Sequence, residues 1–249
     1  MFLSWIVRLL EEFWPLFVSG TITTIEITLF GTVMGYLIGF LMGIIDSTPL
    51  EKKDYSVKGV LLRLLKAISK IYVLLFRGTP MIVQAMVIYY GSLQVFGIDL
   101  NSFVAAVLVV SLNTGAYMAE TVRGGICSID PGQLEGAKAL GMSHVVTMMT
   151  VILPQAFRNI LPQMGNNFIA NIKDTSVLNI ISVSELFFTT KTVAGSYYKY
   201  FEAYTITAII YLILTVVFNF LFGLIEKWCA PNKEYALIDV EEYERGISE

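Results

Sequence analysis

The stretch EGAKALGM, Glu135 to Met142, is polar and contains two glycines, within a chain that is otherwise mostly apolar. It lies between Pro131 and Pro154. Pro131 can open a helix and Gly141 can end one, so the spacing predicts a helix of about two turns here. A second helical piece, MSHVVTMMTVIL, follows. We expect it to end before Pro154, because the residue before a proline avoids the helical conformation.

Neither of these two pieces is long enough to cross a bilayer. A helix rises about 1.5 Å per residue, so about 20 apolar residues are needed to span a hydrocarbon layer of about 30 Å. The sequence therefore predicts a bent pair of short helices at a membrane surface. Such a pair is either a tight connection between spans or a docking surface for another protein. Its length, far more than a turn requires, favours docking.

The composition of the whole chain places it among membrane proteins. Of its 249 residues 55% are hydrophobic and 15% are charged, and the mean hydropathy is +0.68. Soluble domains carry about 25% charged residues. The net charge of −3 argues against a nucleic-acid partner, because a basic footprint is absent. Two distant cysteines, Cys127 and Cys229, suggest neither a disulfide nor a metal site.

The hydropathy pattern predicts an all-α polytopic membrane protein with five transmembrane helices. The expected spans are residues 20–45, 71–95, 103–122, 161–188 and 203–225. Residues 1–18 are expected to form an amphipathic helix at the interface, anchored by Trp5 and Trp14, and not a cleavable signal peptide. Residues 19–228 form the transmembrane domain in this interpretation, and residues 229–249 form an acidic tail.

Positive charge indicates the orientation of these spans. Twelve Lys and Arg residues fall on the side that carries EGAKALGM, against three on the other side, with Arg77 and Lys173 inside spans. Because Lys and Arg are enriched in cytoplasmic loops, the N-terminus is expected outside and the C-terminus in the cytosol. The pair of short helices is then cytosolic.

Two spans carry special backbone features. In the first, Gly31, Gly35, Gly39 and Gly43 form a smooth stripe that another helix can approach closely, either within this chain or in another subunit. In the second, Pro80 is expected to kink the helix. We assign a gate or kink to four successive residues: Arg77, Gly78, Thr79 and Pro80. The Arg77 side chain either reaches lipid headgroups or holds the kink.

Polar residues inside the third and fourth spans are candidates for a substrate pathway. A charge at the bilayer centre costs about 2.5 to 3.5 kcal/mol, so such groups face protein, water or a partner charge. The candidates are Asn113, Tyr117 and Glu120 in the third span, and Asn167, Asn171, Lys173, Asp174, Thr175 and Ser176 in the fourth. Together they offer donors and acceptors for a zwitterion. The alternative is a buried ion pair of Lys173 with Glu120 or Asp174 that fixes helix packing.

The short helical pair also carries a resemblance to a known family. Glu135, Ala137 and Gly141, followed by Val151, Ile152, Leu153 and Pro154, resemble the EAA signature of bacterial ABC importer membrane subunits. Gly136 replaces the usual first alanine, and Val151 stands where isoleucine is common. The resemblance implies a coupling helix near residues 132–142 that sits in a groove of an ATPase subunit. The implied contact residues are Glu135, Gly136, Ala137, Lys138, Ala139, Leu140, Gly141, Leu153 and Pro154.

Three further segments narrow this resemblance. Residues 74–91, 116–126 and 173–181 are similar to the polar amino acid subfamily, the permeases for histidine, glutamine and arginine. The resemblance implies a multi-pass permease subunit of a type I importer in the bacterial cytoplasmic membrane. It also implies these partners: two ABC ATPase subunits, a second permease subunit that is identical or homologous, an external substrate-binding protein and a polar amino acid.

The chain is not expected to be an enzyme. It has no Gly-x-x-x-x-Gly-Lys-Ser/Thr loop, so ATP and magnesium are expected on the partner ATPases, with no cofactor, metal or catalytic residue on this chain. The competing interpretation is a secondary transporter or channel driven by an ion gradient, with the intramembrane charges as an ion relay. Such folds commonly carry internal repeats, and none is visible in this sequence.

Overall fold

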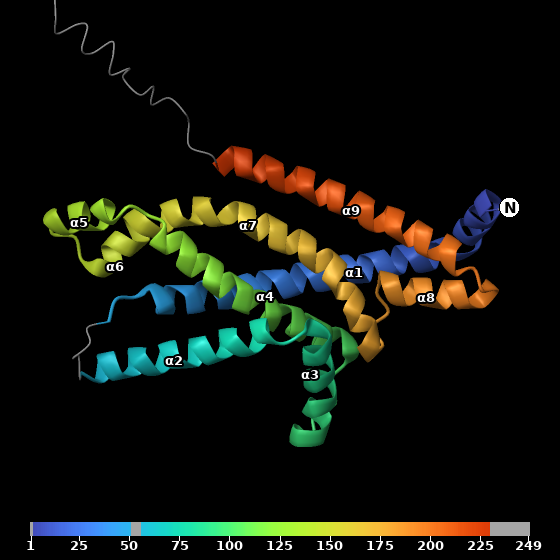
Figure 1. The fold of residues 1–249 in the computed structure, drawn as a ribbon, viewed down its shortest axis with the longest axis horizontal. Coiled ribbons are helices and arrows are strands. Elements are labelled where there is room, and N and C mark those ends of the chain that lie inside the picture. Colours follow the sequence, from blue (N-terminus) through green and yellow to red (C-terminus); the bar gives the residue numbers. More distant parts are fainter. Residues whose placement is uncertain (1, 51–55, 230–249) are drawn as a thin grey trace, which may run out of the picture.

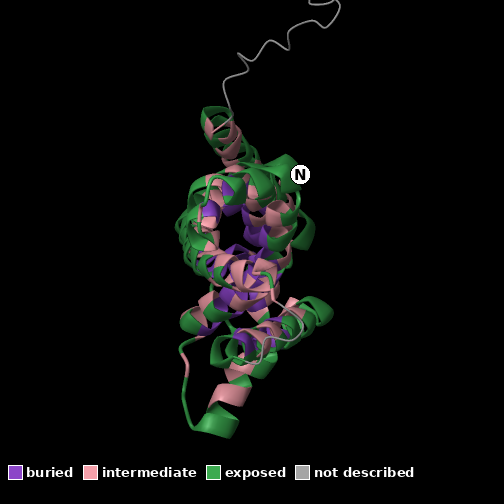
Figure 2. Cartoon of the chain, turned by 90° about the vertical axis from the view of Figure 1, so that its left-hand side faces the viewer, coloured by how far each residue is buried: buried purple, intermediate pink, exposed green. Residues whose placement is uncertain are grey.

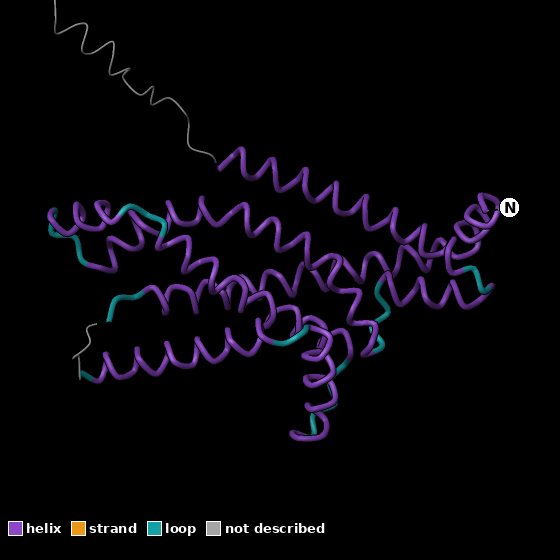
Figure 3. Tube along the Cα trace, viewed as in Figure 1, coloured by secondary structure: helices purple, strands orange, loops and turns teal. Residues whose placement is uncertain are grey.

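The computed structural model describes residues 2–50 and 56–229, and within these ranges the chain forms helices joined by short loops (Figure 3). The α-helices are α1 (Phe2–Ser47), α2 (Val57–Gly78), α3 (Met81–Phe96), α4 (Ser102–Cys127), α5 (Pro131–Ala139), α6 (His144–Thr147), α7 (Leu153–Asp174), α8 (Leu186–Tyr197) and α9 (Tyr200–Cys229). A π-helical turn, η1 (Met148–Ile152), precedes α7, and a 3-10 helix, η2 (Thr175–Ile181), follows it. The expected all-α fold is confirmed. The acidic tail expected at 229–249 lies, after Cys229, outside the described residues.

The described helices contain three that are long and apolar enough to cross a membrane, namely α1, α4 and α9. Two bent pairs raise the number to five if each counts as one span. These pairs are α2 with α3, bent by 112°, and residues 144–181 with α8, bent by 59°. The long helices α1, α2, α4, α7 and α9 run roughly side by side, with α5 and α6 at the opposite end of the bundle from α8 (Figure 1).

The structure joins the predicted interfacial helix and the predicted first span into one helix. α1 runs without a break from Phe2 to Ser47, with Pro15 inside it. Leu9 and Phe17, on either side of Pro15, are fully buried in a cluster with residues of α8 and α9. We infer that this packing offsets the hydrogen bond that Pro15 removes.

The glycine stripe packs inside the chain, against α4. A Cβ atom added to any of these four glycines would clash with a side chain of α4. The clashing pairs are Gly31 with Val110, Gly35 with Thr114, Gly39 with Met118, and Gly43 with Val122. Both sets recur every fourth residue, so one ridge of α4 lies along the groove of α1. The intramolecular alternative is therefore correct. The buried positions lie on the inner faces of the helices and the exposed ones outside (Figure 2).

The expected kink at Pro80 is a full break. The bend of 112° separates α2 from α3, which points away from the bundle axis (Figure 1). Thr79 (φ −124°, ψ 146°) and Pro80 (φ −64°, ψ 141°) both have extended backbones. A residue before proline avoids the helical region, and here two successive extended residues turn the chain by more than a right angle.

The expected helix end before Pro154 is wrong. Helical backbone runs through Pro154, and the residue lies in the first turn of α7. The π-helical turn just before it, Met148–Ile152, carries a hydrogen bond from the Leu153 N–H back to the Met148 carbonyl. A π turn is wider than an α turn, and we infer that it makes room for the proline ring that would otherwise clash with a preceding carbonyl.

Candidate functional site

One side chain, that of Gln84, holds the break between α2 and α3. Pro80 has no N–H, so the carbonyl of Phe76, four residues earlier, lacks its helical donor. Gln84 Nε2 donates to this carbonyl at 2.8 Å and to the Thr79 carbonyl at 2.9 Å. Its Oε1 accepts from Asn113 Nδ2 at 3.0 Å, which ties the break to α4. The break is therefore a defined elbow, with residues 77–80 at its corner.

A polar cavity of about 400 Å³ lies between this elbow, α4 and the α7–η2 segment. Its lining consists of Thr79, Pro80, Met81, Ile82, Asn113, Tyr117, Asn167, Ala170, Asn171, Asp174 and Val177. Amide and phenol groups both donate and accept hydrogen bonds, whereas a carboxylate accepts them. This polar cavity therefore has partners for both the carboxylate and the ammonium group of a zwitterion.

The structure brings most of the predicted pathway residues together in this polar cavity. Asn113 and Tyr117 lie four residues apart on one face of α4. Asn167, Asn171 and Asp174 follow one another at spacings of four and three on α7, so they also share a face. Thr79 and Pro80 of the predicted gate complete the lining.

Four predicted pathway residues lie outside the polar cavity. Glu120 lines a different cavity, and Lys173 has an exposed side chain away from the lining. Thr175 is fully buried, with Oγ1 donating to the Ile172 carbonyl at 2.8 Å, and Ser176 is also outside the lining. The helix tightens to 3-10 form at Thr175, which changes the direction of successive side chains relative to an α-helix.

Two asparagines of α7 play different parts in the polar cavity. Asn171 is buried, and its Nδ2 donates to Thr32 Oγ1 at 2.8 Å and Thr114 Oγ1 at 2.9 Å. It therefore joins α7 to α1 and α4. Asn167 Oδ1 is also buried but has no hydrogen-bond partner in the described part of the chain. An unpaired buried acceptor is unfavourable, so a ligand with an N–H or O–H donor would stabilise it.

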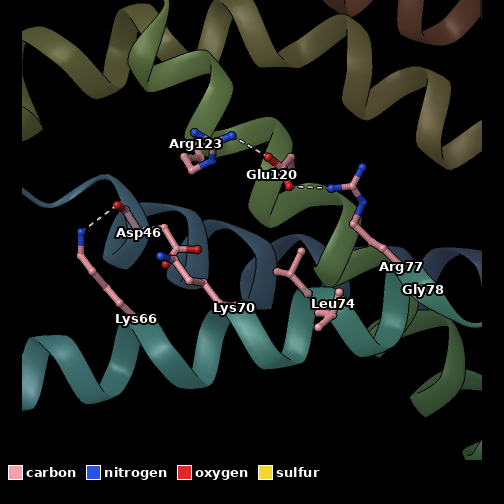
Figure 4. A pocket seen from close by; sticks show the side chains of 9 residues that line it. Asp46, Lys66, Lys70, Leu74, Arg77, Gly78, Glu120 and Arg123 are labelled. Carbon is pink, nitrogen blue, oxygen red and sulfur yellow. Dashed lines mark hydrogen bonds and ion pairs between the residues drawn. The ribbon is translucent and has the colours of Figure 1, made fainter.

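The elbow is also tied to α4 by an ion-pair network. Glu120 accepts from Arg77 Nη1 and from Arg123 Nη2, both at 2.5 Å (Figure 4). The Arg77 guanidinium lies 5.4 Å from the centre of the Tyr117 ring. Among the described residues, Lys173 forms no ion pair with Glu120 or Asp174, so the alternative of a Lys173 pair is not seen. Arg77 instead supports the elbow.

The predicted coupling residues lie on α5 and the turn that follows it. Asp130 caps α5, its side chain accepting from the Gly132 N–H at 2.7 Å. At the other end, the N–H groups of Gly141 and Met142 bond back to the carbonyls of Lys138 and Ala137. Gly141 has φ +76°, which an L side chain rarely adopts. The helix end predicted at Gly141 is therefore present in the structure: Leu140 is the C-cap of α5, and Gly141 is the residue that follows it.

The tip formed by α5, α6 and η1 exposes apolar side chains. Leu140 is 83% exposed, Val145 69% and Met149 62%. Glu135 and Lys138 are exposed beside them, whereas Ala137 is buried. We call the surface formed by Glu135, Lys138, Leu140, Val145 and Met149 the tip surface. Apolar groups rimmed by charges are typical of a protein contact.

Gln84 was not among the residues predicted to be functional. Its signal was present: one amide in the apolar run MIVQAMVIYY, four residues after a proline. A polar residue in an apolar segment that follows a proline can replace the missing backbone donor, and such positions are candidates for elbows.

Gln84→Met is expected to lower the free energy of unfolding by about 1 to 3 kcal/mol, because the Thr79 carbonyl loses its donor and the Phe76 carbonyl keeps only a long bond, of 3.4 Å, from Asn113 Nδ2. Thermal unfolding of the full-length protein in detergent measures the change. Gln94→Met, at an exposed position of the same helix, is the matched control and should keep the wild-type midpoint. Equal midpoints for both variants would show that Gln84 does not hold the elbow.

Comparison with known proteins identifies relatives over most of the chain. Residues 57–233, more than half of the sequence, match the family described as binding-protein-dependent transport system inner membrane component. A protein of Bacillus subtilis (strain 168) named probable amino-acid permease protein is 35% identical over 227 residues, covering 89% of this chain and 97% of that protein. The glutamine transport system permease protein of Escherichia coli (strain K12) is 33% identical over 214 residues, covering 86% of this chain and 92% of that protein.

A solved structure agrees with these relatives. A crystal structure described as an amino acid ABC transporter with histidines matches with a TM-score of 0.78 at 36% sequence identity. The match covers 91% of this chain and 98% of that chain. The helical arrangement described above is therefore shared along nearly the full length of both chains.

Proposed function

The chain belongs to the family of binding-protein-dependent transport system inner membrane components, and on that premise we propose that it is the permease subunit of an ATP-driven importer for polar amino acids. The main support for a polar amino acid as substrate is the polar cavity beside the elbow, with its amide, phenol and carboxylate groups. The relatives whose names mention amino acids or glutamine support the same class.

The polar cavity suggests how an amino acid would be held. Asp174 offers a carboxylate and Asn167 an unpaired acceptor, which suit the ammonium group of the substrate. Tyr117 and the amide of Asn113 offer donors for its carboxylate. In this arrangement Asn171 positions α7 through its bonds to two threonines.

The tip surface supports coupling to a separate ATPase. It presents exposed apolar groups beside Glu135 and Lys138 at one end of the bundle, on a helix that is capped at both ends. Movement of two docked ATPases would tilt α5 and so move α7 through η1. We propose that ATP and magnesium bind only to those partner subunits, and that the tip surface is cytosolic with the N-terminus outside.

The elbow supports alternating access. Arg77 pairs with Glu120, and Thr79 and Pro80 line the polar cavity, so the corner of the elbow touches both the ion-pair network and the proposed substrate position. A change in the α2–α4 distance would therefore open or close one side of the cavity. A second permease subunit, identical or homologous, would complete the pathway, and an external binding protein would deliver the amino acid.

The test is uptake of radiolabelled glutamine or arginine by proteoliposomes that hold this chain with its candidate ATPase and binding protein. Uptake is expected to require ATP and to persist when ionophores collapse the ion gradients. Asn167→Ala should reduce uptake about tenfold, because one hydrogen bond to a charged group is worth about 1.5 to 3 kcal/mol.

The matched control is Asn166→Ala. Asn166 is the preceding residue, is exposed and does not line the polar cavity, so this variant should transport like wild type. Uptake that stops with the ion gradient while ATP is held constant would support the ion-driven alternative. Uptake by Asn167→Ala at the wild-type rate would remove the polar cavity from the pathway.

A further inference from the structure

A second and larger cavity, of about 710 Å³, lies between the end of α1, the second half of α2 and the end of α4. Four cationic side chains line it, Lys66, Lys70, Arg77 and Arg123, together with two carboxylates, Asp46 and Glu120 (Figure 4). We call it the basic cavity. None of these six residues lines the polar cavity beside the elbow.

The protein engages one of the two carboxylates at both oxygens and the other at a single oxygen. Glu120 pairs with both Arg77 and Arg123. Asp46 Oδ2 accepts from Ser69 Oγ at 2.7 Å, and the backbone carbonyl of Asp46 accepts from Lys66 Nζ at 2.9 Å. Asp46 Oδ1 is buried and has no hydrogen-bond partner among the described residues. One carboxylate thus serves two guanidinium groups.

Lys70 has a different position from the other cations. Its side chain lines the basic cavity and is exposed, and it has no hydrogen bond or ion pair with any described residue. Lys66 by contrast is held by two backbone carbonyls, those of Asp46 and Thr48 at 2.9 and 2.6 Å. No group in the described part of the chain therefore competes with a ligand for the Lys70 ammonium group.

The balance of charge in the basic cavity calls for an anion. Cations outnumber carboxylates, and α2 and α4 belong to a membrane bundle, where charges are stable when they are paired. A concave wall of one sign also concentrates counter-ions. Lysine and arginine bind carboxylate and phosphate oxygens through charge-assisted hydrogen bonds.

We propose that the basic cavity is a binding site for an oxyanion, contacted by Lys70 and by the outer N–H groups of Arg77 and Arg123. The rim suggests one source of this anion. Leu74 lines the cavity and is 72% exposed, and on the same helix Leu64 and Ile71 are 57% and 58% exposed. The acyl chain of a lipid would lie along these exposed apolar side chains, with the phosphate of the lipid headgroup in the basic cavity. The second source with the same chemistry is the carboxylate of a small solute.

The site goes beyond the proposed transport function and does not depend on which solute is carried. It requires that α2 and α4 lie in a membrane protein, which family membership supports. Its test therefore measures ligand protection of one lysine and not transport.

The test is acylation of lysines by a water-soluble succinimidyl ester, followed by peptide mass spectrometry. The full-length protein is used in detergent after removal of lipid, with the subunits that co-purify with it. Three probes are added separately: phosphatidylglycerol, a neutral glycolipid, and glutamine. At a ligand concentration of about twice the Kd, mass action leaves about a third of the sites free, so acylation of Lys70 should slow about threefold. Lys58, on the same helix outside the basic cavity, is the internal control and should react at an unchanged rate.

Protection of Lys70 by phosphatidylglycerol but not by the glycolipid identifies a lipid phosphate. Protection by glutamine that is lost with glutaminamide, which lacks the carboxylate, identifies a solute carboxylate. Failure of every probe, or equal protection of Lys58, overturns the proposal.

A pair of variants excludes indirect protection. Lys70→Gln should weaken binding of the protecting ligand at least about threefold, and Lys58→Gln should leave it unchanged, because only Lys70 lines the basic cavity. Unchanged binding by Lys70→Gln would also overturn the proposal.

Discussion

Glu135→Arg is expected to reduce amino-acid-stimulated ATP hydrolysis by the assembled transporter about tenfold or more. Glu135 is an exposed charge on the tip surface, and reversing a charge that is paired across an interface costs about 2 kcal/mol or more. Insertion and folding should be unchanged, since the side chain makes no ion pair within the described residues. The measurement is phosphate release from proteoliposomes with and without substrate.

Gln133→Arg is the matched control for this prediction. It introduces the same side chain on the same short helix, at an exposed position about 200° away around the helix axis. It should retain most of the stimulated hydrolysis. Equal stimulation in Glu135→Arg and wild type would mean that α5 is only a connection between spans, and the coupling proposal would be wrong.

Gly39→Leu is expected to prevent stable folding, with a loss of about 3 kcal/mol or more, because overpacking a tight contact forces its backbones apart. A Cβ atom at Gly39 would lie 3.0 Å from the Gly115 carbonyl oxygen and 3.1 Å from the Ala119 nitrogen. Both are backbone atoms, which cannot move aside as a flexible side chain does. The helices α1 and α4 would have to separate. The amount of protein in membranes and its unfolding midpoint in detergent measure the effect.

The control is Gly223→Leu on α9. A Cβ atom there meets nothing within 4 Å, so the same substitution adds an apolar side chain to an exposed surface. This variant should accumulate and unfold like wild type. If Gly39→Leu matched it, the glycine stripe would not be a helix contact within the chain.

Much of the fold could be predicted because its signals are local. Runs of apolar residues gave the helices α4 and α9 nearly to their ends, and the four-residue spacing of Gly31 to Gly43 indicated a close helix contact. The three prolines Pro15, Pro80 and Pro154 have different effects on the backbone, which the sequence does not distinguish. Pro80 makes a break of 112°, whereas Pro15 and Pro154 lie within continuous helix, since packing and a π turn compensate for them. A proline signals a missing donor, but its surroundings decide the outcome.

The sequence predicted many of the residues that line the polar cavity, but it did not predict how the helices orient all of them. Asn113 and Tyr117 on α4 and Asn167, Asn171 and Asp174 on α7 share faces that the helical period reveals. The helical period of about 3.6 residues cannot show that the helix changes from α to 3-10 form at Thr175, where α7 ends and η2 begins. The position of Gln84 after Pro80 was a visible signal, but its partners were not, because the bond to the Phe76 carbonyl depends on how α3 is oriented relative to α2.

By itself the sequence determined the all-helical fold, the apolar helices α4 and α9, the glycine contact surface and the capped stretch from Pro131 to Gly141, since each follows from residues a few positions apart. Only the tertiary structure decided which groups meet. Arg77 and Glu120 are 43 residues apart, and Asn171 reaches Thr32 across 139 residues. Such pairs depend on how helices cross and rotate about their axes. The packing of the whole bundle determines those crossings, and the pattern of any one segment does not.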